Sequence, residues 1–251
     1  MQSRLVRYDG FFCEAPLPGF EGTLLKVEEP HYNNHLSRLR DQFERAGAIA
    51  LADYELLELV LFRAIPKRDV KPLAKALLQE FGDFAHVISA PDARLKAVTG
   101  LGDAAVLEFK IVEAAAHRLA QGRVMGREAL MNWLALMDYC MTAMSHREIE
   151  EFRVLFLDRK NVLIADEPQA RGTIDHVPVY PREVAKRALE LNASSLILVH
   201  NHPSGDPTPS AEDIKMTEQV EAALKTLGLA LIDHVVIGKG DTISFRAIGY
   251  I

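Results

Sequence analysis

The sequence contains little cysteine, and this limits the chemistry it can support. Of its 251 residues only two are cysteines, Cys13 and Cys140, and they do not form a Cys-x-x-Cys pair. Small secreted domains depend on disulfides, and thiolate metal sites depend on closely spaced cysteines, so neither is expected here. Two isolated cysteines are typical of free thiols in a reducing compartment.

Long hydrophobic runs are also missing. No apolar stretch approaches the roughly 20 residues that a helix needs to span a bilayer. The N-terminus lacks a basic start followed by an apolar core, which is the pattern of a secretory signal peptide. We therefore expect a cytoplasmic protein that has no membrane partner.

Positive charge is scarce over the chain as a whole. The formal net charge is -6, which argues against a general electrostatic attraction to nucleic acid. Residues 31–125 carry 13 Lys and Arg against 12 Asp and Glu, whereas residues 126–251 carry 13 against 18. Only the first of these two regions could therefore offer a surface to nucleic acid.

Residues 31–125 have the pattern of a helical accessory domain, because apolar residues recur there at spacings of three and four. Residues 98–105 resemble the turn of a helix-hairpin-helix module, in which a Gly-apolar-Gly turn directs backbone N–H groups at a DNA phosphate. Asp103 places a negative charge where a phosphate would approach, although it is also an ordinary first-turn acid. We interpret this region first as an accessory domain and only second as a DNA reader.

A second candidate contact for DNA lies within residues 63–75. Basic side chains gather there around one acid, Asp69, a pattern that is also typical of a solvated helix face. The basic residues are Arg63, Lys67, Arg68, Lys71 and Lys75.

Residues 126–251 alternate between strand and helix patterns, which indicates an α/β layer fold. The domain boundary is predicted at the glycine-flanked segment 122–126, and a helix is expected at 128–145. Further strands are expected at 152–158, 161–168, 195–200, 229–237 and 243–246, and further helices at 181–192 and 210–227.

The stretch 200–213 combines two imidazoles, a hydroxyl and a carboxylate directly after an apolar run. His200 and His202 are two positions apart, so both project to the same face if the strand continues through them. Prolines then bend the chain, and Asp213 follows in the first turn of a helix that Ser210 can cap. Two imidazoles and one carboxylate make three metal ligands, which leaves a tetrahedral position for water, as in catalytic zinc sites.

A metal-dependent hydrolase also needs a carboxylate that lies near the metal without binding it. Glu150 and Glu151 begin a strand pattern, and alternation places Glu150 on the side of Phe152, the more apolar face. Glu151 falls on the side of Arg153, and we interpret it as part of a solvated edge. Glu150 is therefore the candidate general base.

At these residues the chain resembles the RadC family, the bacterial branch of the JAMM (MPN+) metalloproteases. The pattern of that group is a strand-borne Glu, then His-x-His-Pro, then Ser, two residues and Asp. Asn201 at the middle position is the RadC form. The pattern falls on Glu150, His200, His202, Pro203, Ser210 and Asp213, and further likeness lies in residues 35–40, 53–58, 66–72 and 233–238.

The resemblance implies a deaminase-like α/β sandwich for the catalytic part, preceded by an all-α domain similar to a helix-hairpin-helix module. It implies zinc ligation by His200, His202 and Asp213, proton transfer by Glu150 and oxyanion stabilisation by Ser210. The alternative for Ser210 is a plain helix cap.

Two functions of different classes follow. The first is a zinc-dependent JAMM-type hydrolase that cleaves a peptide or isopeptide bond in a substrate whose identity the sequence does not reveal. The second is an accessory protein of DNA repair or recombination that binds nucleic acid and carries a structural or vestigial metal site. An intact ligand set together with a candidate base favours the enzyme.

Two segments depart from the resemblance. Residues 1–30 place three phenylalanines among Gly and Pro, and we expect an arm that could pack on a neighbouring copy, so that a monomer and a homodimer both stay open. His176 lies where no ligand is expected, and we interpret it as a surface histidine.

Overall fold

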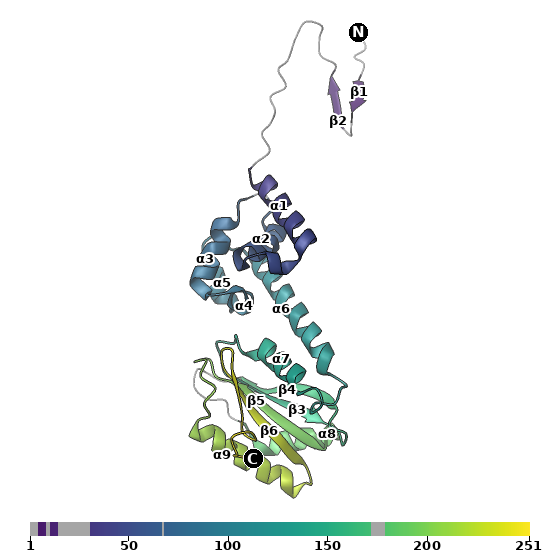
Figure 1. Cartoon of the computed structure of the whole chain (residues 1–251), viewed down its shortest axis with the longest axis vertical. Coiled ribbons are helices and arrows are strands. Elements are labelled where there is room, and N and C mark those ends of the chain that lie inside the picture. Colours follow the sequence, from purple (N-terminus) through teal and green to yellow (C-terminus); the bar gives the residue numbers. More distant parts are fainter. Residues whose placement is uncertain (1–4, 9–10, 15–30, 67, 172–178) are drawn as a thin grey trace.

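The computed structural model describes residues 5–8, 11–14, 31–66, 68–171 and 179–251 (Figure 1). Two short strands, β1 (Leu5–Tyr8) and β2 (Phe11–Glu14), pair with each other in antiparallel orientation. The rest of the predicted arm lies outside the described residues, as do Lys67 and His176. The arm and its packing on a neighbouring copy therefore stay predictions.

The helical region is built around an apolar interior, as the three- and four-residue spacing predicts. Leu57, Leu61, Leu77 and Phe109 are completely buried in it. Each such side chain stabilises the fold by about 1.5–3 kcal/mol through removal from water. The helices are α1 (His31–Ala46), the 3-10 helix η1 (Ala48–Ala50), α2 (Asp53–Ala64), α3 (Lys71–Phe81), α4 (Phe84–Ser89), α5 (Asp92–Ala97) and α6 (Asp103–Val124).

The turn between α5 and α6 has the predicted hairpin shape. Gly100 adopts a φ of 93°, Leu101 is buried beneath the turn, and Gly102 precedes the first residue of α6. Asp103 forms an ion pair with Lys96 at 2.8 Å, which bridges the two helices.

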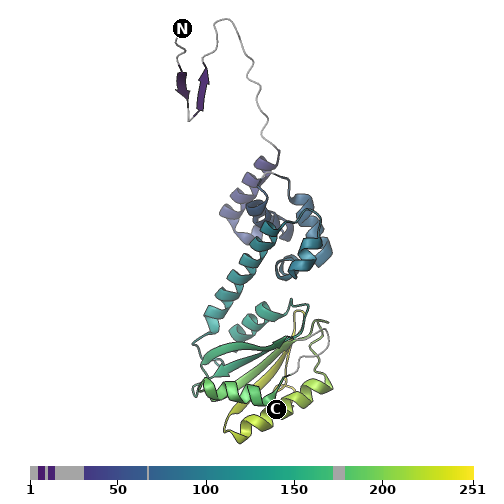
Figure 2. The same ribbon diagram turned by 180° about the vertical axis from the view of Figure 1, so that it is seen from behind.

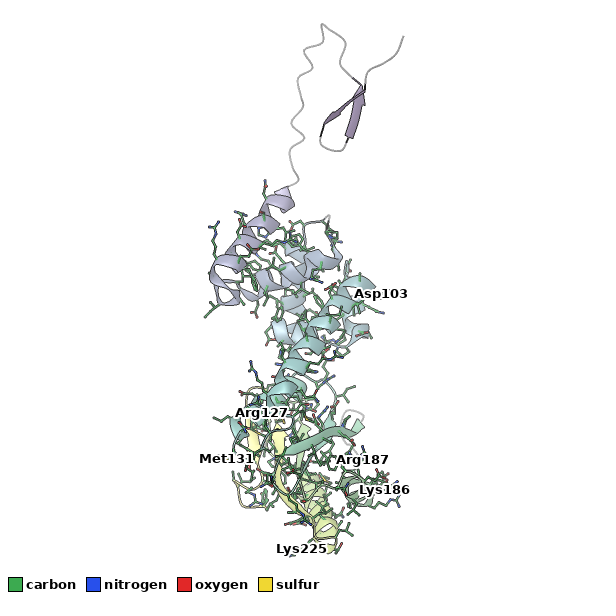
Figure 3. All side chains as sticks on the ribbon, turned by 90° about the vertical axis from the view of Figure 1, so that its right-hand side faces the viewer. Asp103, Arg127, Met131, Lys186, Arg187 and Lys225 are labelled. Atoms are coloured by element: carbon green, nitrogen blue, oxygen red, sulfur yellow. The ribbon has the colours of Figure 1, made fainter. Side chains whose placement is uncertain are left out.

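The helix α6 leads from the helical region to the sheet. Figure 3 shows Asp103, at its start, and Arg127, just beyond its end, in the two different parts of the chain. The prediction of a break at residues 122–126 was wrong at its start, because Gly122 lies inside α6. The chain turns only at Gly126, which has a φ of 70°.

The helix predicted at 128–145 begins later, as α7 (Trp133–Met144). The preceding residues bond to the neighbouring strand segment instead. Gly126 N–H donates to the Leu163 carbonyl at 2.9 Å, and Ala129 N–H donates to the Asn161 carbonyl at 2.8 Å. Glu128 also forms an antiparallel bridge with Val162, so residues 126–129 pair with the strand segment and the helix starts only after them.

The second part of the chain is a five-stranded mixed sheet in the order β4-β3-β5-β6-β7. The pair β5 and β6 is parallel, and the other neighbouring pairs are antiparallel. This confirms the predicted helical region followed by an α/β layer fold. The strands are β3 (Glu151–Leu157), β4 (Leu163–Arg171), β5 (Ser195–Asn201), β6 (Ala230–Ile237) and β7 (Thr242–Ser244).

Helices cover both faces of the sheet. The helix α7 packs on the face that carries Leu155 and Ile197, whereas α8 (Pro181–Glu190) and α9 (Ala211–Thr226) pack on the face that carries Phe156 and Leu198. Figure 2 shows α8 and α9 in front of the sheet. The strand β5 is therefore buried along its whole length, so polar groups at its end lie at the edge of a dry interior.

The structure also bears on the expectations about membrane spans and cysteines. Among the described residues, no helix is both long enough and apolar enough to cross a membrane. Cys140 is a free thiol buried within α7.

Candidate metal centre

Three side chains converge where β5 ends. His200 is completely buried in β5, His202 follows one residue after the strand, and Asp213 lies in the first turn of α9. The Nε2 atoms of His200 and His202 are 3.0 Å apart. The Asp213 oxygens lie 3.3 Å from His200 Nε2 and 3.4 Å from His202 Nε2. These three residues could therefore hold a metal ion.

The ring orientation of His202 is fixed by a backbone acceptor. Its Nδ1 lies 2.8 Å from the carbonyl oxygen of Asp206, and a carbonyl can only accept, so Nδ1 carries the proton. In the neutral ring, Nε2 then presents its lone pair towards His200 and Asp213. This second bond to a backbone carbonyl is the arrangement that orients metal-binding histidines.

The orientation of His200 follows from a longer chain of hydrogen bonds. The Thr217 hydroxyl donates to the Asp213 carbonyl at 2.6 Å, so its oxygen accepts from His234 Nδ1, also at 2.6 Å. His234 Nε2 must then accept from His200 Nδ1, at 2.7 Å. The lone pair of His200 is thereby left on Nε2, which faces the other two donors.

His234 itself is held neutral. Burial is the main cause that lowers its pKa well below the ordinary value for histidine, and the neighbouring His200 lowers it further. A neutral ring can donate from one nitrogen and accept at the other, which is the role that the chain from Thr217 to His200 requires of it.

The Asp213 carboxylate is anchored by the start of its own helix. Its Oδ2 accepts from the N–H of Ser210 at 2.8 Å and from the Ser210 hydroxyl at 2.7 Å, and the hydroxyl oxygen accepts from the N–H of Asp213. Burial raises the pKa of Asp213, but its interactions with His200, His202 and Ser210 outweigh burial and hold the pKa well below its usual range. The carboxylate is therefore ionised at neutral pH.

The donor set fits a cation. With both Nδ1 atoms engaged as donors, two imidazole lone pairs and one carboxylate face a common point. Such a group is stable only with a positive charge between its members, either a proton or a metal ion. The hydrogen bond to Asp213 accordingly raises the pKa of His202, so protons and metal compete for the site.

Close backbone contacts hold the loop that carries His202. The His202 N–H donates to the Ile237 carbonyl at 2.9 Å, and Lys239 N–H donates to the Gly205 carbonyl at 3.0 Å. A Cβ at Gly238 would lie 2.4 Å from that Gly205 oxygen. Only glycine therefore permits the end of β6 to approach the loop this closely.

Glu150 lies just before β3, on the side of the metal donors by strand parity. The residues Phe152 and His200 are paired across β3 and β5, so Glu150, two positions before Phe152, shares the face of His200. Its negative charge contributes to the raised pKa of His202, after the hydrogen bond to Asp213 and that to the Asp206 carbonyl. It also lines a cavity of about 400 Å³.

The interpretation of Glu151 as a solvated edge was wrong. This residue is only 3% exposed, and its carboxylate accepts from Arg153 at 2.6 Å. Arg153 also forms a bidentate pair with Asp166, with both distances at 2.9 Å, and the Tyr139 hydroxyl donates to the same carboxylate. The helix α7 covers this face, and alternation alone could not reveal that both faces of β3 are buried.

Asn201 connects the metal-donor strand to the segment that carries Glu150. Its Oδ1 accepts from Glu151 N–H at 2.9 Å, and its Nδ2 donates to the Ile149 carbonyl at 3.2 Å. One side-chain amide, 1% exposed, therefore holds the peptide groups on both sides of Glu150. The sequence identified Asn201 only as a family feature and gave it no role.

Three of the five basic side chains predicted to contact DNA have partners in the helical region. Arg63 forms an ion pair with Glu108 at 2.8 Å, and Lys71 and Lys75 lie over the ring of Tyr54. Arg68 lies against Gly100 of the hairpin turn. Contact with DNA through residues 63–75 or 98–105 stays a prediction.

Comparison with known proteins gives related chains. A family model described as RadC-like JAB domain matches residues 130–250. A UPF0758 protein of Ruegeria pomeroyi is 64% identical over 223 residues, which is 88% of this chain and 100% of that protein. A UPF0758 protein of Rhodobacter capsulatus is 68% identical over 211 residues, 84% of this chain and 99% of that protein. The likeness extends well beyond the residues that the family model matches.

The substitution Asn201→Ala should loosen the segment around Glu150 while leaving the metal donors in place. The N–H of Glu151 loses its acceptor and the Ile149 carbonyl loses its donor, so unfolding should become easier by roughly 2 kcal/mol. Amide exchange of residues 147–151 should accelerate, which mass spectrometry of the exchanged protein can measure. Ser195→Ala, at the other end of β5, is the control and should leave this exchange unchanged. Unaltered exchange at residues 147–151 in Asn201→Ala would show that Asn201 does not hold the segment.

Proposed function

The chain belongs to the RadC family, whose members carry the RadC-like JAB domain, and on that premise we propose that it is a zinc-dependent hydrolase of peptide or isopeptide bonds. The observation that carries this proposal is the convergence of His200, His202 and Asp213 at the open end of a buried strand, with Glu150 on the same face. Three protein donors and a nearby carboxylate that is not among them are the components of a catalytic metal site.

The donor types favour zinc over harder cations. Imidazole nitrogens suit zinc and neighbouring transition metals, whereas calcium and magnesium prefer oxygen donors. His200 Nε2, His202 Nε2 and a carboxylate oxygen of Asp213 would hold the ion. When bound, zinc lowers the pKa of water to about 7 and polarises a carbonyl oxygen.

Glu150 is the proposed general base. Its carboxylate would take the proton from the attacking water and deliver it to the nitrogen of the departing amine. The position of Glu150 beside a cavity of about 400 Å³ leaves room for a substrate to approach it. Asn201 positions the backbone on both sides of Glu150 for this transfer.

Ser210 is proposed to stabilise the oxyanion that forms during the attack. Its hydroxyl lies at the start of α9, beside Asp213, and hydroxyl donors near a developing negative charge have this effect. In the structure the same hydroxyl donates to Asp213 and caps the helix, so it would have to rotate in order to donate to substrate.

We rank second a DNA-binding accessory function with a structural metal site. The hairpin turn between α5 and α6 favours it. The ion pairs of Lys96 with Asp103 and of Arg63 with Glu108 offset positive charge that phosphate binding requires. Lys71 and Lys75 lie over the Tyr54 ring.

Glu150→Gln should lower kcat for a cleaved peptide by roughly a hundredfold or more, with little change in KM, because proton transfer acts in the transition state. A peptide-library cleavage screen with and without chelator first identifies a substrate, and steady-state kinetics then compare the variants. Glu151→Gln is the comparison, because its carboxylate is paired with Arg153 although the residue lines the same cavity. If Glu151→Gln were inactive while folded and Glu150→Gln were active, the base would be misassigned by one residue.

Ser210→Ala separates the two roles of that hydroxyl. Loss of the cap costs about 1 kcal/mol of folding free energy. Loss of an oxyanion donor lowers kcat by roughly a hundredfold or more. We expect both effects, with zinc content preserved, measured by thermal unfolding and kinetics. Ser204→Ala, in the same loop, should change neither. A Ser210→Ala variant with a lower melting temperature but an unchanged kcat would show that Ser210 only caps the helix.

A further inference from the structure

An apolar cavity of about 180 Å³ lies between the helical region and the sheet domain. Its walls come from α4, α6 and the end of α7 and include Phe84, Ile88, Val112 and Ala143. Figure 1 shows α7 on the side of the sheet that faces the helical region. The two parts of the chain therefore build this cavity together, and neither part could form it alone.

The cavity adjoins the space beside Glu150. Ser89, Glu113 and Arg147 line both the apolar cavity and the cavity of about 400 Å³ that Glu150 also lines. A third cavity, of about 140 Å³, shares Arg147 with both and reaches Pro203, the residue directly after His202. A substrate bound at the candidate metal centre could thus extend along this cleft towards the helical region.

We infer that the apolar cavity is a specificity pocket, and that it holds one apolar side chain, of about the size of leucine or phenylalanine, belonging to the peptide substrate. The inference rests on the proposed function, because the cleft gains this meaning only if Glu150 and the metal donors cleave a peptide. It assigns the helical region to substrate recognition.

The size of the pocket fits this occupant. An enclosed apolar cavity of about 150 Å³ binds a benzene ring. The present cavity is open to solvent but of similar size, about 180 Å³, which is enough for a single aliphatic or phenyl side chain. Its lining also offers one polar atom for a neighbouring peptide group. The Nδ1 of His146 is buried and has no hydrogen-bond partner in the part of the chain that the structure describes. A substrate amide beside the apolar side chain would satisfy it.

The charge of the cleft disfavours nucleic acid as the occupant. Five acidic residues and two basic ones, Lys110 and Arg147, line the cavity that contains Glu150. Lys110 is already bound to the Ala90 carbonyl at 2.8 Å and to Glu113 at 3.0 Å. A phosphate chain would meet net repulsion there, whereas an uncharged peptide backbone with an apolar side chain would not.

Adjacent alanines of α6 provide a matched pair of variants. Ala116 lines the pocket and is exposed at its mouth, so Ala116→Phe should fill the space without disturbing the core. Ala115 is also exposed but does not line the pocket, and Ala115→Phe adds the same side chain elsewhere on the helix. Equal melting temperatures of the two variants would show that both fold.

Binding is measured on the full chain carrying Glu150→Gln, so that turnover does not interfere. The probes are N-acetyl-leucinamide and N-acetyl-glycinamide, observed by saturation-transfer NMR. We expect transfer to the leucine probe at least fivefold above that to the glycine probe. Ala116→Phe should remove this excess and Ala115→Phe should retain it.

Two results would contradict the proposed pocket. One is equal saturation transfer to both probes, and the other is a greater transfer to the leucine probe that persists in Ala116→Phe. Neither result depends on catalysis. If the expected binding pattern appears but the wild-type chain cleaves no peptide, the proposed function fails while the pocket stands. If the chain cleaves peptides with no preference for an apolar side chain, and Ala116→Phe cleaves them normally, the pocket fails while the function stands.

Discussion

The candidate site depends on the confinement of three lone-pair donors at the end of a buried strand. His200 is completely buried, and its free nitrogen faces a second imidazole and an ionised carboxylate. The orientation of each ring is set from behind, by the Asp206 carbonyl and by the chain through His234 and Thr217. These contacts pre-organise the donors. Burial of the donors without a cation between them costs free energy, and a bound cation removes that cost.

The sequence predicted the convergence of His200, His202 and Asp213 because strand alternation and helix capping are local rules. The spacing of His200 and His202 at the end of a strand, and of Ser210 and Asp213 at a helix start, required no knowledge of the tertiary fold. His234, Thr217 and the role of Asn201 could not be predicted, because their contacts join segments far apart in the chain. The helix start at Trp133 and the burial of Glu151 were mispredicted for the same reason: pairing with β4 and coverage by α7 override local pattern.

Asn201 and the apolar cavity both lie close to Glu150. Asn201 holds the peptide groups beside Glu150 on the same strand that supplies His200. The cavity that Glu150 lines adjoins a second cavity with walls from α4 and α6. Under the proposed function, the helical region contributes walls to the substrate site.

The most direct test of the account is the zinc content of the purified full-length chain and three variants, measured by mass spectrometry after zinc loading and removal of excess metal. We expect about one zinc per chain in the wild type and in Glu150→Gln, and none in His202→Ala or Asp213→Ala, because only the last two remove a proposed ligand. Loss of zinc in Glu150→Gln would make Glu150 a ligand, and full zinc in Asp213→Ala would contradict the His200, His202 and Asp213 site.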